Sequence, residues 1–383
     1  MHDPGHHPTR RTVLAAGGAM AAGGLPGLPT DRRRGDRPGL GAAEAGPVAL
    51  SPQQQAGQRV VFSYPGTTVP QSLLDQIAAG QAAGVIINSG NVTGLSQITA
   101  VVRQLRQAGA SSPDPAPLLL MTDQEGGQVR RLPGAPAQSE KQIGQSADPV
   151  SGASAAGTGA GNLLRGAGLN VNLAPVLDVY RSAGDFDDQY GRSYSTDPTV
   201  VSDCGHAFVT AQQATGVAAT AKHFPGLGPA TSSQNTDLRP VTLRTALSDL
   251  RATDEFPYTA ALSAGVDLVM VSWAIYSHLD AAHPAGLSST VVQGELRGRL
   301  GFTGVTITDA IAAGALSGLG TIGQNAVAAA AAGMDVILEA SGSVANGQAV
   351  VSALATALQN GSLDATGFGA ALGRINALRN RLF

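Results

Sequence analysis

Residues 118–123 read LLLMTD, an unbroken apolar run that ends in a single carboxylate, Asp123. A strand with one face in water alternates apolar and polar residues, whereas a continuous run is typical of a strand buried on both faces. Similar runs recur along the chain, and amphipathic stretches such as 96–109 and 289–301 lie between them. The eight runs are 60–64, 84–88, 118–123, 170–179, 217–223, 267–273, 304–309 and 334–340.

Eight buried strands that alternate with helices predict an α/β protein, a closed (β/α)8 (TIM) barrel in a single domain over residues 56–383. The alternative is an open, doubly wound sheet, but no GxGxxG motif follows the first run. Because the carboxyl ends of barrel strands meet at one mouth, polar residues there predict a site. The polar residues at or near these ends are Asp123, Asp178, Lys222, His223, Ser272 and Asp309.

The composition excludes several classes of function. The 383 residues include 24 basic and 27 acidic side chains, and a net charge of −3 gives no electrostatic reason to bind nucleic acid or an anionic membrane. The single cysteine, Cys204, excludes an intrachain disulfide and a cysteine-built metal site, and we expect it to be buried. With no His-x-x-Glu-His cluster, phosphate-binding glycine loop or redox motif, we expect neither a metal nor an organic cofactor.

The first 55 residues differ from the rest of the chain. Arg10 and Arg11 precede a weakly apolar Gly/Ala-rich stretch at 15–28, which is typical of a twin-arginine export signal, and a flexible leader follows it. The stretch is too short and interrupted to span a membrane, and no cysteine follows it to carry a lipid. We therefore expect an exported protein without a stable membrane anchor, located outside the cell or in the cell wall or periplasm.

Five motifs carry a resemblance to a known family. They are DQEGGxVxRL at 123–132, LNxNxAPVxDV at 169–179, GRSYSTDP at 191–198, KHFPG at 222–226 and LGFTGVxITDA at 300–310. In this order they resemble the family 3 glycoside hydrolases, in particular the single-domain β-N-acetylhexosaminidase branch. The resemblance runs from about residue 58 to the C-terminus.

The resemblance implies a monomeric, retaining exo-β-glycosidase that hydrolyses terminal β-N-acetylglucosaminides of cell-wall (peptidoglycan) or chitin fragments. Asp309 matches the nucleophile, which would form a covalent glycosyl-aspartate intermediate. Such a carboxylate must stay ionised, and we expect cations such as Lys222 to lower its pKa. The structural alternative is that Asp309 caps a helix starting at Ala310.

The resemblance also implies a set of carbohydrate-binding residues. Asp123 matches the carboxylate that holds two sugar hydroxyls, which suits a group able to accept several hydrogen bonds. We expect Asp178 to support its neighbours and Glu125 to be structural. The family's remaining polar contacts to the sugar match Arg131, Arg192, Lys222 and His223. The alternative for these four basic residues is that they form structural ion pairs around the mouth of the barrel.

The pattern breaks after the KHFPG motif. In the hexosaminidase branch the segment reads KHFPGHG and an Asp-x-His pair follows, whose histidine is the general acid/base. Here Leu227 replaces the first histidine and no histidine occurs between residues 224 and 277, so that role transfers to no residue. Asp237 is the ionisable acid of the loop 224–238, and we take it as a hypothetical acid/base. The alternative is a polar turn residue, and His278 and His283 are distant candidates.

Two other functions remain open at this stage. The missing histidine favours a catalytically impaired barrel that binds sugars or muropeptides, although the retained Asp309 argues against it. A β-glucosidase or β-xylosidase is the other alternative. Larger family members of that kind usually carry a second domain with a glutamate acid/base, whereas this chain ends soon after its eighth strand–helix unit.

Overall fold

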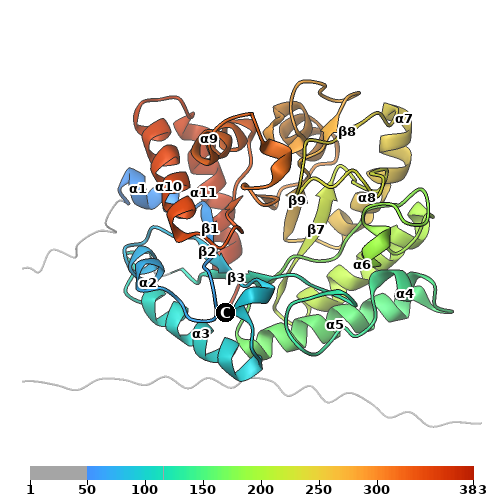
Figure 1. The fold of residues 1–383 in the computed structure, drawn as a ribbon, viewed down its shortest axis with the longest axis horizontal. Coiled ribbons are helices and arrows are strands. Elements are labelled where there is room, and N and C mark those ends of the chain that lie inside the picture. The colour runs from blue at the N-terminus through green and yellow to red at the C-terminus, as the bar shows by residue number, and fades with distance from the viewer. Residues whose placement is uncertain (1–49, 115) are drawn as a thin grey trace, which may run out of the picture. The chain divides into compact units, whose positions relative to one another are not determined.

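The computed structural model describes residues 50–114 and 116–383. Eight parallel strands form one sheet in the order β11-β9-β7-β6-β3-β2-β1-β12, and helices surround it (Figure 1). Seven of the strands lie within the apolar runs and β7 extends one residue beyond its run, so the sequence prediction of the strands is confirmed. The strands are β1 Val60–Phe62, β2 Gly84–Ile86, β3 Leu119–Thr122, β6 Val171–Asn172, β7 Ala218–Phe224, β9 Leu268–Val271, β11 Val305–Thr308 and β12 Ile337–Leu338.

The sheet closes between its first and last strands. β11 and β12 meet in a parallel bridge between Ile307 and Val336. The Val336 N–H donates to the Thr306 carbonyl at 2.9 Å, and the Thr308 N–H donates to the Val336 carbonyl at 3.0 Å. These bonds join the two edges, so the predicted (β/α)8 barrel is confirmed and the open sheet is wrong.

The core has an inner and an outer layer, which explains why the strands are continuously apolar. Val61 and Met121 belong to a cluster inside the barrel, whereas Val60 and Leu120, their chain neighbours, pack in the cluster under the helices. Successive side chains of a strand point to opposite faces, and here both faces are buried.

The outer layer consists of one main helix after each strand. In α3, the buried residues Ile98, Val101, Val102 and Leu105 form the i, i+3, i+4, i+7 stripe of a helix that packs on a core. The predicted helices at 96–109 and 289–301 are confirmed as α3 and as the π-helix η5. The helices are α2 Gln71–Ala78, α3 Leu95–Gly109, α5 Pro149–Ala167, α6 Pro198–Gln213, α8 Phe256–Ser263, η5 Thr290–Arg299, α9 Ile322–Ala332 and α10 Val344–Gln359, with α11 Ala365–Arg379 at the end.

Short elements interrupt some of the strand–helix connections. The most relevant are the hairpin of β4 and β5 after β3, and η2 between β6 and α6. These insertions bring backbone and side chains over the carboxyl ends of the strands. The short elements are η1 Ser89–Asn91, β4 Gln124–Gly126, β5 Val129–Arg130, α4 Glu140–Gly144, η2 Asp188–Tyr190, β8 Thr242–Leu243, α7 Leu247–Asp249, η3 Leu250–Asp254, β10 Ile275–Tyr276, η4 Ala285–Leu287 and η6 Gly314–Leu316.

The described part of the chain begins just before helix α1 (Pro52–Gly57), which crosses the predicted boundary between the leader (1–55) and the barrel (56–383). Ser51 caps this helix and forms a capping box with Gln54, so it is a regular element of the fold. The predicted export signal lies outside the described residues. Among those residues, no helix combines the length and the apolar character needed to cross a bilayer.

Candidate active site

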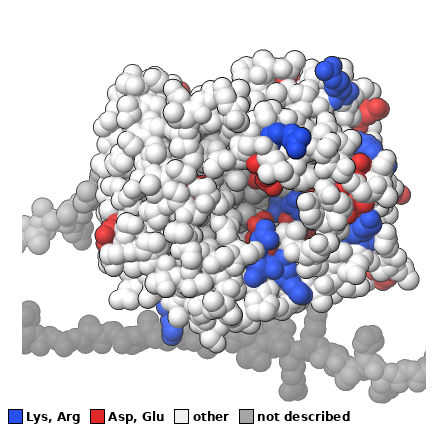
Figure 2. Space-filling model, in the orientation of Figure 1, with Lys and Arg blue, Asp and Glu red and all other residues white. Residues whose placement is uncertain are grey.

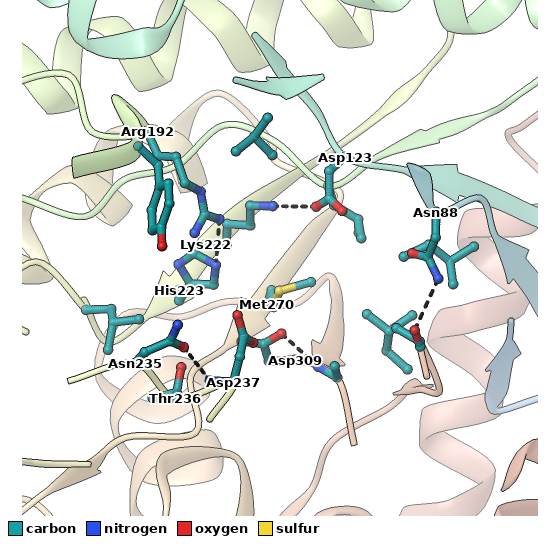
Figure 3. A pocket seen from close by; sticks show the side chains of 18 of the residues that line it. Asn88, Asp123, Arg192, Lys222, His223, Asn235, Thr236, Asp237, Met270 and Asp309 are labelled. Atoms are coloured by element: carbon teal, nitrogen blue, oxygen red, sulfur yellow. Dashed lines mark hydrogen bonds and ion pairs between the residues drawn. The ribbon is translucent and has the colours of Figure 1, made fainter. Parts of the chain in front are cut away.

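A pocket of about 460 Å³ opens at the carboxyl ends of the barrel strands. Figure 2 shows a hollow in this face of the molecule, with acidic and basic side chains gathered around it. All seven residues that the sequence assigned to the site line the same pocket. They are Asp123, Arg131, Arg192, Lys222, His223, Asp237 and Asp309 (most are labelled in Figure 3).

The strand ends explain four of these positions. Asp123 follows β3 directly, and Asp309 follows β11 directly. Lys222 and His223 lie at the carboxyl end of β7. Arg131 reaches the same place from the end of the β4–β5 hairpin, and its guanidinium lies 3.5 Å from the Asp123 carboxylate. Apolar side chains from other strands, such as Met270, close the bottom of the pocket.

Lys222 lies between two carboxylates. Its Nζ is 2.8 Å from Asp123 Oδ1 and 2.7 Å from Glu125 Oε1, and its side chain is only 2% exposed. Burial opposes ionisation of Asp123, but the charges of Lys222 and Arg131 outweigh it and hold the pKa of Asp123 well below its ordinary value. Asp123 is therefore a permanent carboxylate in the pocket. Glu125 is buried and does not line the pocket, in agreement with the structural role expected for it.

Arg192 is the second buried cation of the site. It donates two hydrogen bonds of 2.9 Å to Glu125 and one of 2.7 Å to Asp187 Oδ1. Its Nη2 also lies 3.3 Å from His223 Nε2. Because the bidentate pair fixes the plane of the guanidinium, Arg192 holds Glu125, Asp187 and His223 in one arrangement. We call Asp123, Glu125, Asp178, Asp187, Arg192, Lys222 and His223 the floor network.

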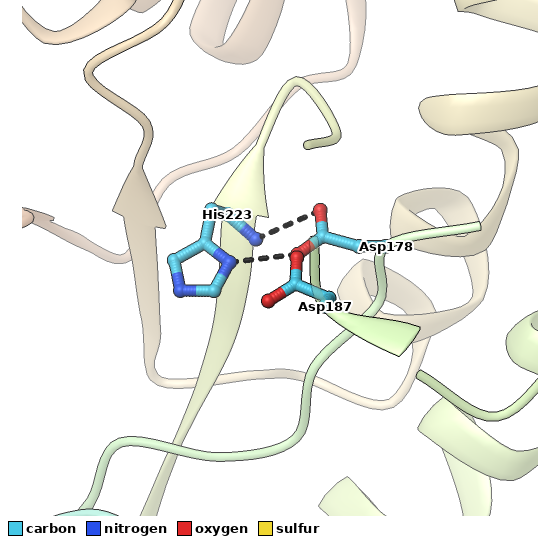
Figure 4. A group of neighbouring side chains, drawn as sticks. All are labelled: Asp178, Asp187 and His223. Carbon is cyan, nitrogen blue, oxygen red and sulfur yellow. Dashed lines mark hydrogen bonds and ion pairs between the residues drawn. The ribbon is translucent and has the colours of Figure 1, made fainter. Parts of the chain in front are cut away.

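His223 has a defined tautomer in this arrangement. Its Nδ1 lies 2.7 Å from Asp178 Oδ2 (Figure 4), and Arg192 can only donate to Nε2. Nδ1 therefore carries the hydrogen. Burial and the charge of Arg192 lower the pKa of His223 to about 4, so the ring is neutral near pH 7. Asp178 also accepts from the Leu227 N–H at 2.5 Å, which agrees with the supporting role expected for it.

Asp187 is buried next to Asp178. Burial raises its pKa to about 7 against the opposing charge of Arg192, and a hydrogen bond with the Asp178 carboxyl adds to the rise. Among the described residues, Asp187 Oδ2 has no N–H or O–H partner, and protonation of Asp187 supplies a hydrogen that a neighbouring carboxylate can accept. Within the floor network, Asp187 is thus the group that takes up a proton as the pH falls through about 7.

Asp178, Asp187 and His223 are also close enough to be tested as a metal site, since one ligand atom of each lies within 4.8 Å of the others (Figure 4). The residues do not fit this use. Arg192, a fixed cation, already bonds to both Asp187 and His223, and His223 Nδ1 already donates to Asp178. A metal ion would have to displace both sets of contacts.

Asp309 lies on the opposite side of the pocket from Asp123. Its carboxylate accepts the Ala310 N–H at 2.7 Å, but no helix starts there, because α9 begins at Ile322. The helix-cap alternative is therefore wrong. The expected pKa shift is also wrong in direction: burial raises the pKa of Asp309, and the lowering by His223 and Lys222 does not compensate. The negative charge of Asp237 adds to the rise.

Asp237 belongs to residues 230–238, which we call the rim loop. The loop is bonded to the segment after β11, since the N–H groups of Gly314 and Ala315 donate to the carbonyls of Asp237 and Thr236 at 2.8 and 2.9 Å. Asp237 is exposed at the mouth, yet its carboxyl group points into the pocket beside Asp309 (Figure 3). Desolvation raises its pKa against the opposing charge of Arg192.

Sequence reasoning missed some of the residues that shape the pocket. Phe186 and Asp187 lie in an irregular loop and Tyr190 lies in the short helix η2 that follows it. Strand and helix periodicity give no information in such a segment, although its position just before GRSYSTDP was a usable signal. Asn88 lines the opposite wall and donates to the Ala340 carbonyl at 3.1 Å. The distant histidine candidates, His278 and His283, do not line this pocket.

The chain is similar to known proteins in sequence. Residues 53–378 match the glycosyl hydrolase family 3 N terminal domain. An uncharacterized secreted glycosyl hydrolase of Arthroderma benhamiae is 45% identical over 345 residues, which cover 90% of this chain and 97% of that protein. A beta-hexosaminidase of Xylella fastidiosa is 34% identical over 286 residues, covering 73% of this chain and 82% of the other.

The fold has a close counterpart among solved structures. The family 3 beta-N-acetylglucosaminidase of a Paenibacillus species superposes with a TM-score of 0.82 at 32% identity, over 87% of this chain. This chain spans 63% of the length of that enzyme.

Proposed function

The chain belongs to glycosyl hydrolase family 3 and is a glycoside hydrolase, and from this premise we propose its substrate and the roles of its residues. The proposed reaction is the removal of terminal β-linked N-acetylglucosamine with retention of configuration. The names of the Xylella and Paenibacillus relatives support this sugar.

One observation carries the proposal. Two carboxyl groups, Asp309 and Asp237, face the same pocket, and the charge of Asp237 contributes to the raised pKa of Asp309. Retaining glycosidases need such a pair, one carboxylate to attack the anomeric carbon and one carboxylic acid to protonate the leaving oxygen. Two carboxyls that influence each other across a pocket favour the state in which one is ionised and the other protonated.

The proposed first step starts from ionised Asp309 and protonated Asp237. An Asp309 oxygen attacks the anomeric carbon, the bond to the leaving oxygen breaks, and the Asp237 proton passes to that oxygen. In the second step Asp237 accepts a proton from water as the water oxygen attacks the anomeric carbon. The bond to Asp309 then breaks, and both carboxyl groups return to their initial states.

The members of the floor network that line the pocket are proposed to bind the terminal sugar together with Arg131. Asp123 is ionised and can accept from two hydroxyls, while Lys222 and Arg131 can donate to sugar oxygens beside it. Arg192 and His223 complete this set at the centre of the pocket. Because apolar side chains such as Met270 and Leu338 close the bottom, only a terminal residue enters, which supports exo action.

The setting of the reaction is also a proposal. The part of the predicted leader that precedes helix α1 would act as a twin-arginine export signal and leader, and a relative named as secreted supports export. The protein would then act outside the cytoplasm, as a monomer without a nucleic-acid partner, on fragments of peptidoglycan or chitin. No metal or organic cofactor is needed for the proposed steps.

The test is to trap the intermediate on the purified chain. A 5-fluoro-N-acetylglucosaminyl fluoride forms the glycosyl-enzyme quickly and releases it slowly, and mass spectrometry should find the adduct on the peptide containing Asp309. The variant Asp309→Ala should form none. Absence of an adduct on the native chain would instead support a sugar-binding barrel, and turnover of only aryl glucosides or xylosides would support the other hydrolase classes.

A further inference from the structure

Two large apolar side chains remain in water on the segments that border the pocket. Tyr190 is 41% exposed and lines the pocket, and Leu238, directly after the pocket residue Asp237, is 68% exposed. Exposed apolar side chains are common singly, but here one lines the pocket and the other directly follows a residue that lines it. The exposure of Tyr190 and Leu238 beside the pocket therefore requires an explanation. The exposure of Phe256 on α8, which lies outside the pocket, does not.

The segment that carries Tyr190 is held firmly. Asp188 accepts the Gly184 N–H at 2.7 Å and pairs with Lys141 at 2.6 Å, and these contacts fix the turn around η2. The Tyr190 ring packs against buried Phe186 with the ring planes at 83° and the centroids 6.1 Å apart. Tyr190 is therefore an aromatic surface in a set position.

The rim loop is connected to the same segment. The Phe186 N–H donates to the Ala230 carbonyl at 2.9 Å, so a backbone hydrogen bond joins the loop with Tyr190 to the rim loop with Leu238. The rim loop is also bonded to the segment after β11 through Gly314 and Asp237. The acid and the two apolar side chains thus form one continuous, anchored border.

The place of the leaving group follows from the pocket. In the proposed reaction the terminal sugar fills the closed inner part, from Asp123 to Asp309, so everything beyond the cleaved bond lies at the mouth. A pyranose ring has one face made of C–H groups, which packs on an aromatic ring as other apolar surfaces do. We propose that Tyr190 and Leu238 form a binding site for the leaving sugar, so that the chain prefers a β-linked disaccharide unit to a small aglycone.

This inference rests on the proposed function and names its substrate class more closely. The experiment compares kcat/KM for chitobiose with kcat/KM for methyl β-N-acetylglucosaminide. The acidity of each leaving alcohol is the same for the native chain and a variant, so a change in the ratio between them measures binding of the second sugar. In Tyr190→Ala we expect the ratio to fall about tenfold, and in Leu238→Ala about threefold.

Controls separate stacking from general damage. Tyr190→Phe keeps the ring and should keep the ratio, and Phe256→Ala removes an exposed aromatic ring outside the pocket and should not change it. An unchanged ratio in both Tyr190→Ala and Leu238→Ala would overturn the inference. So would a loss in Tyr190→Phe as large as in Tyr190→Ala. If Tyr190→Ala does not fold, the Leu238→Ala ratio decides.

Failure of the proposed function has a different signature, because the native chain would then hydrolyse neither compound. A third substrate, N-acetylglucosamine β-linked to N-acetylmuramic acid, distinguishes the two sources of such a disaccharide. A higher kcat/KM than for chitobiose assigns the site to peptidoglycan fragments, and a lower one assigns it to chitin. The dependence on the Tyr190 ring should be present for the preferred disaccharide.

Discussion

The floor network and the rim loop meet in one pocket but are held in different ways. The floor network consists of buried charges from the ends of β3 and β7 and from the loop before α6, joined by ion pairs such as Lys222 to Asp123 and Glu125. The rim loop is attached mainly through backbone hydrogen bonds to Gly314 and Ala315. We therefore expect the floor network to bind a sugar in only one geometry. The rim loop, in contrast, can be displaced without unfolding the barrel.

The two regions also differ in how well their residues match the family motifs. Those of the floor that contact the pocket match the family motifs. Just before the rim loop, Leu227 replaces a histidine of the hexosaminidase branch, and the rim loop itself has no histidine and carries Asp237 as its ionisable acid. A buried network changes only if several partners change together, because each unpaired charge is costly. An exposed loop tolerates substitution, so a different acid can replace the original one there.

The largest effect should follow removal of the central cation, Lys222→Met. Asp123 and Glu125 would then face each other without their shared cation, so we expect the free energy of unfolding to fall by about 3–5 kcal/mol. We also expect kcat/KM to fall by about a thousandfold, since the sugar contacts lose their geometry. Urea denaturation and steady-state kinetics measure the two quantities.

The matched control is Arg381→Met. Arg381 pairs with Asp267 at 2.7 Å, but its side chain is 64% exposed and lies outside the pocket. A surface pair of this kind contributes at most about 1 kcal/mol. Equal losses of stability in the two variants would contradict the distinction between buried floor and exposed periphery.

The acid on the rim loop should show a smaller and selective effect. In Asp237→Asn, kcat/KM should fall about a hundredfold for a phenyl glycoside, which needs protonation, and little for a dinitrophenyl glycoside, which does not. Stability should stay close to that of the native chain. Asp280→Asn, in a loop outside the pocket, is the control. Small and equal losses on both substrates would exclude Asp237 as the acid.

The raised pKa of Asp187 predicts that the stability of the fold depends on pH. The pKa of Asp187 is about 7 in the folded chain, above the value of about 4 for an unfolded aspartate. Between these values the folded chain holds a proton that the unfolded chain releases, so stability should fall as pH rises from about 4 to 7. Asp187→Asn keeps a donor toward Asp178 but has no charge, so it should flatten this slope. The free energy of unfolding of the variant, relative to that of the native chain, should be about 2 kcal/mol more favourable at pH 8 than at pH 5.

Thermal or urea unfolding at a series of pH values tests this prediction. Asp203→Asn, on the exposed face of α6, serves as the control and should keep the native slope. A variant Asp187→Asn with an unchanged slope would mean that the proton is not held at this position. Buried Asp254, whose pKa is also raised to about 7 by burial, should leave part of the slope in place.

The sequence predicted the barrel and the floor for the same physical reason. A strand buried on both faces reads as an apolar run, and the polar residue that ends it lies at the mouth, as Asp123, Lys222 and Asp309 do. The shift in the pKa of Asp309 was predicted in the wrong direction. The sequence indicated the nearby cations, which lower the pKa, but not the extent of burial, which raises it more. Tyr190 was missed because the GRSYSTDP motif marks its segment as part of the site but does not indicate which side chain of a single helical turn will face the pocket.

The smallest effect should come from moving the rim loop without changing its residues. A Cβ added at Gly314 would lie 2.3 Å from the Leu238 carbonyl carbon and 2.4 Å from its oxygen, so Gly314→Ala must push the loop outward. We expect kcat/KM for the phenyl glycoside to fall about five- to tenfold and that for the dinitrophenyl glycoside to change little.

The limit on this effect is set by Asp237 itself, because displacing an acid cannot cost more than removing it. In the double variant of Gly314→Ala with Asp237→Asn, the loss should therefore equal that of Asp237→Asn alone, since both act through the same proton. Gly369→Ala in α11, where an added Cβ meets no other atom within 4 Å, is the control. Losses that multiply in the double variant would show that Gly314 supports the pocket through something other than the position of Asp237.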